Sequence, residues 1–339
     1  MRIAVTGGAG YIGSHTVVEL LSAGHDVLIV DNFRNSSPEV ISRIQLISNR
    51  QPQLEQISVL DEQRLETALV DFQPDGVIHF AGLKAVGEAA RVPLNYYQTN
   101  VEGSLKLFRA MEKAGCHHLV FSSSATVYGH PDRLPVDEGQ PCRPTNAYGR
   151  TKEIIERVIR DWGAADDRVS AVSLRYFNPV GAHETGEIGE DPNGVPDNLM
   201  PFVAQVAVGR REELSVFGRD YDTPDGTGLR DYIHVVDLAL AHLAALEFIS
   251  DRTGVDEINV GTGRGHTVME MISAFENASG QRVAHKFVGR RAGDTARSVA
   301  DVQKSRKLLG WTATRNLDRM CRDTWNWQNK NPNGLRPDV

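Results

Sequence analysis

Two side chains with complementary proton chemistry, Tyr148 and Lys152, lie four residues apart in the sequence. On a helix this spacing places the phenol and the ammonium on one face, about one turn apart. A free tyrosine has a pKa of about 10, so a phenolate base at neutral pH needs a pKa lower by about 3 units, or about 4 kcal/mol. One positive charge about 4 Å away supplies a similar free energy at an effective dielectric of about 20. The pair therefore predicts proton abstraction by Tyr148, with Lys152 lowering the pKa of the phenol.

A run of hydroxyl side chains at 122–126 supports this interpretation, because tyrosine and lysine at this spacing are also common on ordinary helices. The apolar segment 118–121 before the run is typical of a buried strand, so the hydroxyls follow its carboxyl end. Ligands bind at that end of the strands in open parallel sheets. A hydroxyl there can relay a proton to Tyr148.

A glycine-rich turn follows the first apolar run of the chain. Residues 3–5 lead into Gly7, Gly10 and Gly13, and a helical pattern continues over 14–23. Without Cβ atoms, such a turn lets backbone amides and a helix N-terminus approach a pyrophosphate. This stretch predicts a dinucleotide site.

The next apolar strand pattern, 27–30, ends at Asp31. An acid at this strand end is placed to accept hydrogen bonds from the adenosine ribose hydroxyls, which favours NAD as the cofactor. Arg34 leaves the 2′-phosphorylated cofactor open as an alternative, because a nearby arginine can bind that phosphate.

Strand and helix patterns alternate through the first half of the chain. Beyond the second strand we expect strands at 56–59, 76–80, 118–121 and 170–175, a helix from 93 to 114, and another helix carrying Tyr148. Repeated strand–helix units of this length predict an α/β fold with a doubly wound, parallel, Rossmann-type sheet.

The pattern changes after residue 177. Segments 178–198 and 217–231 are rich in loop residues, whereas 258–261 is typical of a buried strand that returns to the sheet. We therefore expect a Rossmann domain over 1–177, with a returning segment near 231–262. A smaller, discontinuous C-terminal substrate-binding domain is expected over 178–230 and 263–339, with the cleft between the domains as the default binding site.

Composition limits the partners and the compartment. A formal net charge of −7 argues against a nucleic-acid surface, which needs a basic face. Cys116, Cys142 and Cys321 are far apart and predict neither a disulfide framework nor a metal site, so a reducing cytoplasm is expected. A strand pattern begins at Arg2, so we expect no signal peptide, and charges interrupt the apolar tract at 234–249, so we expect no membrane span.

The chain as a whole resembles the extended short-chain dehydrogenase/reductase superfamily. The motifs that carry this resemblance are 7–13, Asp31, 80–88, 122–128, and Tyr148 with Lys152. Within the superfamily, 174–182, 198–201 and 230–235 closely resemble the UDP-glucose 4-epimerase family, and the similarity runs nearly end to end.

This resemblance implies a tightly held NAD that takes a hydride from C4 of a UDP-hexose and returns it to the opposite face of a 4-keto intermediate. UDP-galactose and UDP-glucose would be interconverted, which serves galactose metabolism and the supply of UDP-sugars. Tyr148 would remove the proton of the 4-hydroxyl, Lys152 would lower the pKa of Tyr148 and hold the nicotinamide ribose, and Ser124 would bridge to the same hydroxyl. The resemblance also implies a homodimer, formed through helices that begin near Pro93 and Asn146.

The resemblance extends residue by residue to both ligands. Cofactor contacts are expected at Gly7, Gly10, Tyr11, Ile12, Gly13, Asp31, Asn32, Asn35, Ser36, Ser58, Val59, Phe80, Ala81, Gly82, Lys84, Thr99, Ser124, Tyr148, Lys152 and Phe177. Substrate contacts are expected at Lys84, Ser124, Tyr148, Asn178, Asn198, Leu199, Ser215, Val216, Phe217, Arg230, Arg291, Asp294 and Ser298. In this second group two arginines suit a diphosphate, an aromatic ring suits the uracil and an acid suits the uridine ribose.

Several positions depart from the family pattern or vary within it. Ser58 and Val59 stand where the family usually has an acid at the end of the third strand, so we expect a weaker contact there and retained NAD. Thr99 replaces a residue that is often asparagine. Ser298 stands where members carry either a bulky tyrosine or a small residue. The small side chain predicts that the UDP-N-acetylhexosamines are also substrates.

Two other functions remain as alternatives. A nucleotide-sugar dehydratase or decarboxylase would need a further acid–base pair, and dehydratases commonly carry Asp-Glu where Ala125 and Thr126 stand here. A non-catalytic NAD-binding regulator would not need Tyr148 and Lys152. Ala125 and Thr126 therefore argue against a dehydratase, and the presence of Tyr148 and Lys152 argues against a non-catalytic regulator.

Overall fold

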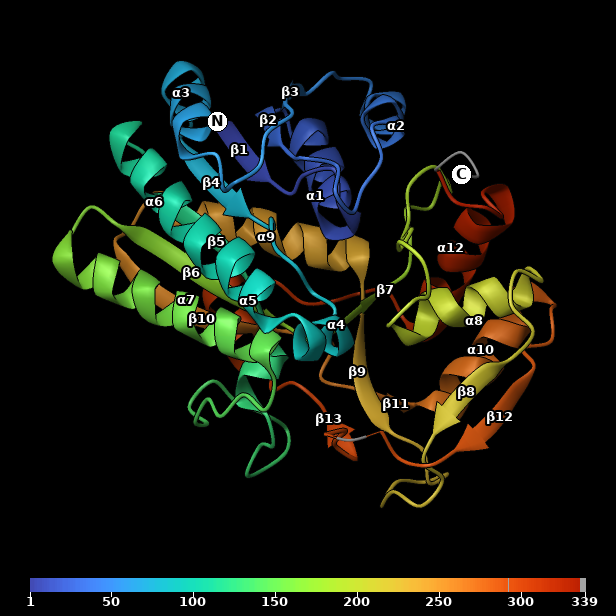
Figure 1. The fold of residues 1–339 in the computed structure, drawn as a ribbon. Helices are drawn as coiled ribbons and strands as arrows, with labels where there is room; N and C mark the ends of the chain where they lie inside the picture. The colour runs from blue at the N-terminus through green and yellow to red at the C-terminus, as the bar shows by residue number, and fades with distance from the viewer. Residues whose placement is uncertain (292, 336–339) are drawn as a thin grey trace.

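The computed structural model describes residues 1–291 and 293–335. It consists of a seven-stranded parallel sheet between two layers of helices, with a smaller group of helices and short strands beside the sheet (Figure 1). Position 292 and the last four positions of the expected 263–339 segment lie outside the described residues.

The sheet has the strand order β10-β6-β5-β4-β1-β2-β3, and all of its pairs are parallel. Its strands are β1 (Arg2–Thr6), β2 (Asp26–Val30), β3 (Gln53–Glu55), β4 (Gly76–His79), β5 (His118–Ser124), β6 (Ser170–Tyr176) and β10 (Gly254–Val260). Most are continuous runs of buried residues, as expected for strands covered on both faces. The predicted doubly wound sheet is confirmed, and β10 overlaps the strand expected at 258–261.

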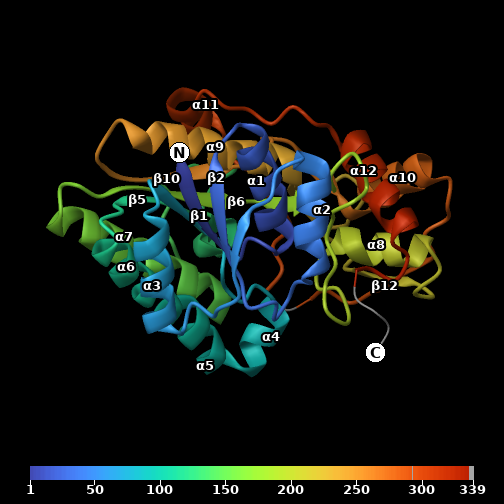
Figure 2. The ribbon, with the colours of Figure 1, turned by 90° about the horizontal axis from the view of Figure 1, so that it is seen from above.

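Helices cover both faces of this sheet (Figure 2). On one face lie α1 (Tyr11–Ser22), α2 (Glu39–Ser48) and α9 (Val235–Ser250), with α11 (Gln303–Leu309) outside α9; on the other lie α3 (Glu62–Phe72), α6 (Gly103–Lys113) and α7 (Ala147–Ala165). Strand side chains alternate between the two layers: Ile78 and Val120 pack toward α1 and α9, whereas Val77 and Leu119 pack toward α3 and α6.

Two expected elements differ from the structure. The third strand is β3 at 53–55, so its prediction at 56–59 is wrong. Ile57 and Val59 are instead buried in an irregular segment that packs on the α3 and α6 layer. The expected helix from 93 to 114 is divided into α5 (Pro93–Tyr96), the π-helix η1 (Tyr97–Glu102) and α6, and a short helix α4 (Val86–Arg91) precedes it.

The smaller group packs around a separate apolar core that includes Met200, Met271, Phe275 and Met320. Its elements are α8 (Leu199–Ala207), α10 (Val268–Ser279), α12 (Leu317–Lys330), the pair β8 (Leu214–Phe217) with β12 (His285–Val288), and the strands β7 (Asn178–Val180), β9 (Leu229–His234), β11 (Gly265–Thr267) and β13 (Arg297–Ser298). β7 and the start of β9 lie within stretches that were expected to be loops. β7 pairs in parallel with the end of β9, at 178–180 with 232–234, and the start of β9 pairs with β11 and β13.

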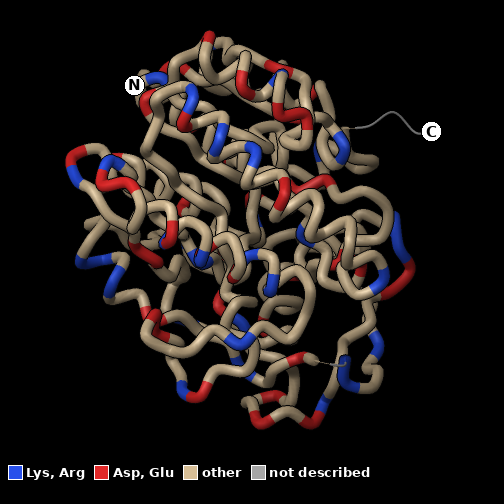
Figure 3. Tube along the Cα trace, turned by 60° about the vertical axis from the view of Figure 1, so that its left-hand side comes forward, with Lys and Arg blue, Asp and Glu red and all other residues tan. Residues whose placement is uncertain are grey.

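Lys and Arg positions are interspersed with Asp and Glu positions along the chain trace in Figure 3. Among the described residues, no helix has both the length and the apolar character that a membrane span requires, and no group of three or more His, Cys, Asp or Glu side chains is arranged to hold a metal ion.

Candidate active site

The expected catalytic side chains meet at the carboxyl ends of the central strands. Ser124 is the last residue of β5, and the 3-10 turn η2 (Ala125–Tyr128) follows it. Tyr148 and Lys152 lie in the first two turns of α7, whose N-cap Asn146 accepts a hydrogen bond from Gly149 N at 2.8 Å. A Cβ at Gly149 would lie 2.8 Å from Thr126 O, so only glycine lets α7 pack directly on η2. This close contact brings Tyr148 to Ser124.

Lys152 is buried and is fixed by the backbone. Its Nζ donates to the Ser122 carbonyl at 2.6 Å, and lies 4.8 Å from the centre of the Phe121 ring and 5.8 Å from that of the Tyr148 ring. Burial lowers the pKa of Lys152 to about 7, while the nearby Glu156 carboxylate raises it. The cationic form of Lys152 therefore depends on nearby negative charge.

Burial raises the pKa of Tyr148 to about 12, and its hydrogen bond with Ser124 lowers it. This direction is opposite to the sequence-based expectation that Lys152 alone brings the phenol close to ionisation. The reason is that desolvation disfavours the phenolate, while Lys152 directs its hydrogen bond to Ser122 rather than to the phenol. A further positive charge beside Tyr148 is needed to make it a base at neutral pH.

Ser124 connects this pair to the turn after β5. Its Oγ accepts hydrogen bonds from Thr126 N at 3.2 Å and from Thr126 Oγ1 at 2.9 Å, so it also caps η2. With Thr126 as a donor on one side, the Ser124 hydroxyl is oriented toward Tyr148.

The glycine turn after β1 has the form that a pyrophosphate requires. A Cβ at Gly7, which has a φ of +71°, would lie 2.7 Å from Ala81 N, and one at Gly13 would lie 2.2 Å from Gly7 O. The twelve-residue helix α1 begins after Gly10 with no side-chain cap and no acid in its first turn. Its positive N-terminal end is therefore free of competing carboxylates and suits an anionic group.

Asp31 lies at the end of β2, next to this turn. One of its carboxylate oxygens accepts from Ala9 N at 3.0 Å, and the other accepts from Phe33 N at 2.8 Å and Ser36 Oγ at 2.9 Å. These bonds fix the carboxylate at the strand end. Arg34 donates its backbone N–H to the Asn32 side chain at 3.0 Å.

The remaining expected cofactor residues lie around the same edge of the sheet. Ile12 is in α1, Phe80, Ala81, Gly82 and Lys84 follow β4, Thr99 is in η1, Phe177 follows β6, and Asn35, Ser58 and Val59 follow β2 or β3. The Tyr11 hydroxyl donates to Gly181 O at 2.6 Å, and so links the glycine turn to the segment after β7.

Sequence reasoning missed Asn100, which is buried in η1. Its side chain accepts from Leu83 N at 2.8 Å and donates to Leu83 O at 3.0 Å and Thr151 Oγ1 at 3.0 Å. Asn100 thus ties the loop after β4 to the helix that carries Tyr148 and Lys152. An asparagine inside a predicted helix gives no sequence signal for this role.

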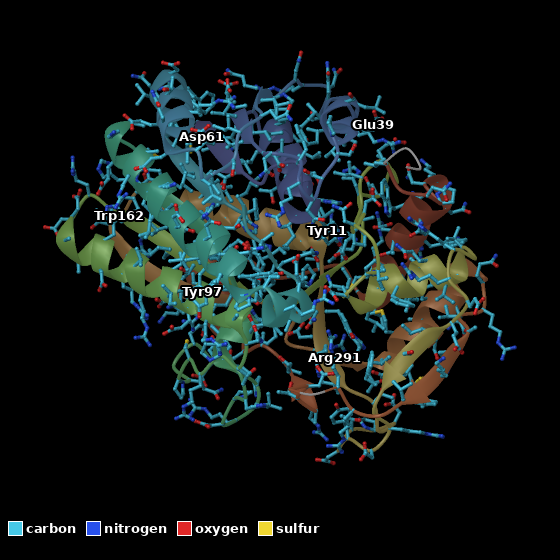
Figure 4. All side chains as sticks on the ribbon, viewed as in Figure 1. Tyr11, Glu39, Asp61, Tyr97, Trp162 and Arg291 are labelled. Atoms are coloured by element: carbon cyan, nitrogen blue, oxygen red, sulfur yellow. The ribbon has the colours of Figure 1, made fainter. Side chains whose placement is uncertain are left out.

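Apart from Lys84, Ser124 and Tyr148, the expected nucleotide-sugar residues lie on the smaller group. Arg230 on β9 lies 3.5 Å from an Asp294 carboxylate oxygen and pairs in register with Ser298 on β13. The Arg291 guanidinium lies 5.9 Å from the centre of the half-exposed Phe217 ring. Figure 4 shows Tyr11 and Arg291 along the boundary between the sheet and the smaller group.

Arg291 also faces the sheet domain, since a Cβ at Gly87 in α4 would lie 3.5 Å from its Nη2. Asn178 is on β7, Asn198 and Leu199 are at the start of α8, and Ser215 and Val216 are on β8 beside Phe217. The structure therefore places guanidinium, aromatic and carboxylate side chains opposite the catalytic edge of the sheet.

The sequence matches the model of the NAD dependent epimerase/dehydratase family over residues 3–261. It is 52% identical to the UDP-glucose 4-epimerase of Bacillus subtilis (strain 168), covering 99% of each chain, and 52% identical to that of Homo sapiens, covering 98% of each. Among solved structures, UDP-glucose 4-epimerase from Bifidobacterium longum in complex with NAD+ and UDP has a TM-score of 0.96 at 49% identity, over 99% of this chain and 100% of that one. The enzyme from Stenotrophomonas maltophila, with bound NAD and formylated UDP-arabinopyranose, has a TM-score of 0.96 at 49% identity, over 97% of this chain and 98% of that one.

Proposed function

We infer the roles of single residues from one premise: this chain belongs to the NAD dependent epimerase/dehydratase family, among its UDP-glucose 4-epimerases. It uses NAD to invert C4 of UDP-hexoses. The arrangement of Tyr148 between Ser124 and Lys152 at the end of β5 supports their assignment as the catalytic residues.

When bound, NAD supplies the hydride acceptor for C4 and the donor that returns the hydride. We propose that Tyr148 takes the proton of the 4-hydroxyl and later returns it, and that Ser124 hydrogen-bonds the same hydroxyl and orients it. Lys152 stabilises the phenolate by its charge and hydrogen-bonds the nicotinamide ribose. Because burial raises the pKa of Tyr148, the positive charge that the oxidised cofactor would bring would favour the phenolate.

The cofactor residues are proposed from the same geometry. The Gly7, Gly10 and Gly13 turn and the N-terminus of α1 would hold the pyrophosphate, and Asp31 the adenosine ribose. Asn100 would fix the loop after β4 against α7.

For the nucleotide sugar, Arg230 and Arg291 would bind the diphosphate, Phe217 would contact the uracil and Asp294 the uridine ribose. A firm hold on the UDP leaves the sugar free to turn over between the two hydride transfers. Return of the hydride to the opposite face of the 4-keto intermediate would then invert C4 of the sugar.

A direct assay tests this function. Purified enzyme with no added NAD is incubated with UDP-galactose, and the product is identified by anion-exchange chromatography. The proposal predicts UDP-glucose, because the cofactor stays bound through the cycle. Absence of conversion by protein that retains NAD would contradict it.

A second substrate class is proposed from Ser298. Its small side chain lies in register with Arg230, beside the expected diphosphate site, which supports room for a substituent at C2 of the sugar. UDP-N-acetylglucosamine and UDP-N-acetylgalactosamine are then also interconverted.

We also propose a cytoplasmic homodimer. The surface of α5, η1 and α6 exposes Leu94 at 80% and Leu105 at 37%, with Tyr97 and Val101 between them, which supports burial against a second copy. Leu94→Glu should yield monomers in analytical ultracentrifugation; an unchanged dimer would place the interface elsewhere.

The cytoplasmic location is proposed from the cysteines. Cys116, Cys142 and Cys321 are free thiols, which supports a reducing compartment.

A further inference from the structure

Glu190 joins the two halves of the active site through a single oxygen atom. Its Oε1 accepts a hydrogen bond from Lys84 Nζ at 2.7 Å and another from Asn198 Nδ2 at 2.9 Å. Its side chain is only 8% exposed, although Lys84 is 47% exposed. A nearly buried carboxylate is thus placed between one residue of the sheet domain and one of the smaller group.

The backbone around Glu190 is fixed from the far side by the C-terminal segment. Gly189 packs on the ring of Trp327 so closely that a Cβ there would lie 2.3 Å from it. Asp191 accepts a hydrogen bond from Leu335 N at 2.9 Å. Since both neighbours are anchored, Glu190 presents its carboxylate at a defined position.

The two donors differ in the ligands expected to contact them: Lys84 is expected to contact both the cofactor and the substrate, whereas Asn198 is expected to contact the substrate alone. Lys84 lies in the loop after β4, with its Nζ 6.0 Å from the centre of the Tyr11 ring, next to the glycine turn. Asn198 precedes α8 but makes no side-chain cap with that helix, and its amide is directed to Glu190 instead. Asparagine commonly caps a helix N-terminus through its side chain. Its orientation here is therefore set by the carboxylate.

We propose that Glu190 is a positioning residue that couples cofactor binding to UDP-sugar binding by holding Lys84 and Asn198 on one oxygen. This inference rests on the proposed function of those two residues. The charge of Glu190 is compensated by Lys84, so it orients Asn198 without repelling the diphosphate. Displacement of one donor moves the acceptor of the other, which links the two sites.

Two substitutions separate the hydrogen bonds from the charge. Glu190→Ala removes the shared acceptor, whereas Glu190→Gln retains a carbonyl oxygen that can accept from both donors. The Kd of UDP for the holoenzyme is measured by calorimetry, together with kcat and KM for UDP-galactose. We expect Glu190→Ala to weaken UDP binding about tenfold, Glu190→Gln about threefold, and KM to change more than kcat.

Glu187→Gln is the matched control. Glu187 lies in the same loop and pairs with Arg43 and Lys330, away from the catalytic edge. The Glu187→Gln substitution should leave the Kd of UDP unchanged. Release of NAD from the holoenzyme, followed by fluorescence, should be faster in Glu190→Ala than in this control.

A double-substitution cycle distinguishes positioning from general destabilisation. If Glu190 acts by holding Asn198, Glu190→Ala adds nothing to the loss of UDP affinity caused by Asn198→Ala. Fully additive losses, or a Glu190→Ala enzyme that binds UDP as tightly as wild type, would overturn the inference. Wild-type enzyme that binds no UDP would refute the proposed function itself, so the two failures are distinguishable. Should Glu190→Ala not fold, Glu190→Gln and the same cycle decide the matter.

Discussion

The Lys152 ammonium lies 5.8 Å from the centre of the Tyr148 ring and is held there by the carbonyl of Ser122, not by the phenol. Its position is therefore set by β5 and α7 and does not depend on whether Tyr148 is ionised. Burial raises the pKa of Tyr148 and lowers that of Lys152, so neither group reaches its catalytic charge state without help from bound ligands or nearby acids.

The buried amine gives a stability signature. Because burial lowers the pKa of Lys152 from 10.5 to about 7, the folded state releases a proton that the unfolded state keeps over this range. This group therefore makes the free energy of unfolding rise with pH between these two values. In cofactor-free protein, Lys152→Met should gain stability relative to wild type near pH 7, and that gain should shrink toward about pH 10. Urea denaturation at several pH values measures the difference in free energy of unfolding between the variant and wild type. A difference that is constant with pH would contradict the lowered pKa of Lys152.

Ser124→Ala should lower kcat by about 10²-fold, since a positioned proton-transfer group contributes about 10²–10⁴. The hydrogen bond from Ser124 lowers the pKa of Tyr148, so its loss should also move the rise of the pH–rate profile to higher pH. Ser124→Thr, which restores the hydroxyl, should recover part of both effects. An unchanged profile in the alanine variant would exclude this role.

Beneath the catalytic edge, Glu156 and Arg175 form a buried ion pair at 2.6 Å, with side chains 0% and 3% exposed. Glu156→Gln leaves a buried guanidinium without its counter-charge and should lower the free energy of unfolding by about 3–5 kcal/mol. The exposed pair of Lys113 with Glu66 is the control, and Glu66→Gln should change stability by less than about 1 kcal/mol. Equal effects in chemical denaturation would contradict this contrast.

Ser298→Tyr should retain activity on UDP-galactose while losing activity on UDP-N-acetylgalactosamine by at least about tenfold, because a bulky side chain fills the space for the acetyl group. Steady-state kinetics with both sugars measure the ratio. Wild type that does not convert the acetylated sugar would show that the small side chain at 298 is insufficient.

Much of the sheet domain follows from the sequence because its strands are buried on both faces and read as continuous apolar runs. β3 was misplaced for the opposite reason: all three of its residues are exposed, whereas Ile57 and Val59, which have the apolar pattern, are buried outside any strand. β7 was not predicted because it is short and contains Pro179, so its sequence shows no strand pattern. Its partner strand β9 is also far away in the sequence.

The residues of the site also fall into those that local sequence predicts and those that it does not. Motif residues such as Gly7 and Asp31 follow strand ends, so their placement depends on local sequence. Glu190 and Asn100 make their contacts with distant segments, at separations that no periodicity encodes. The direction of the Tyr148 pKa also escaped prediction, because it depends on burial by the whole fold rather than on the spacing to Lys152.

The central claim is that Tyr148 is the base that moves the proton of the 4-hydroxyl. The most direct test is kcat of Tyr148→Phe for UDP-galactose, measured on protein shown by absorbance to retain NAD and by calorimetry to bind UDP. Loss of the phenol should lower kcat by about 10³-fold or more, with UDP affinity unchanged. A folded, NAD-loaded Tyr148→Phe enzyme that turns over near the wild-type rate would contradict the account.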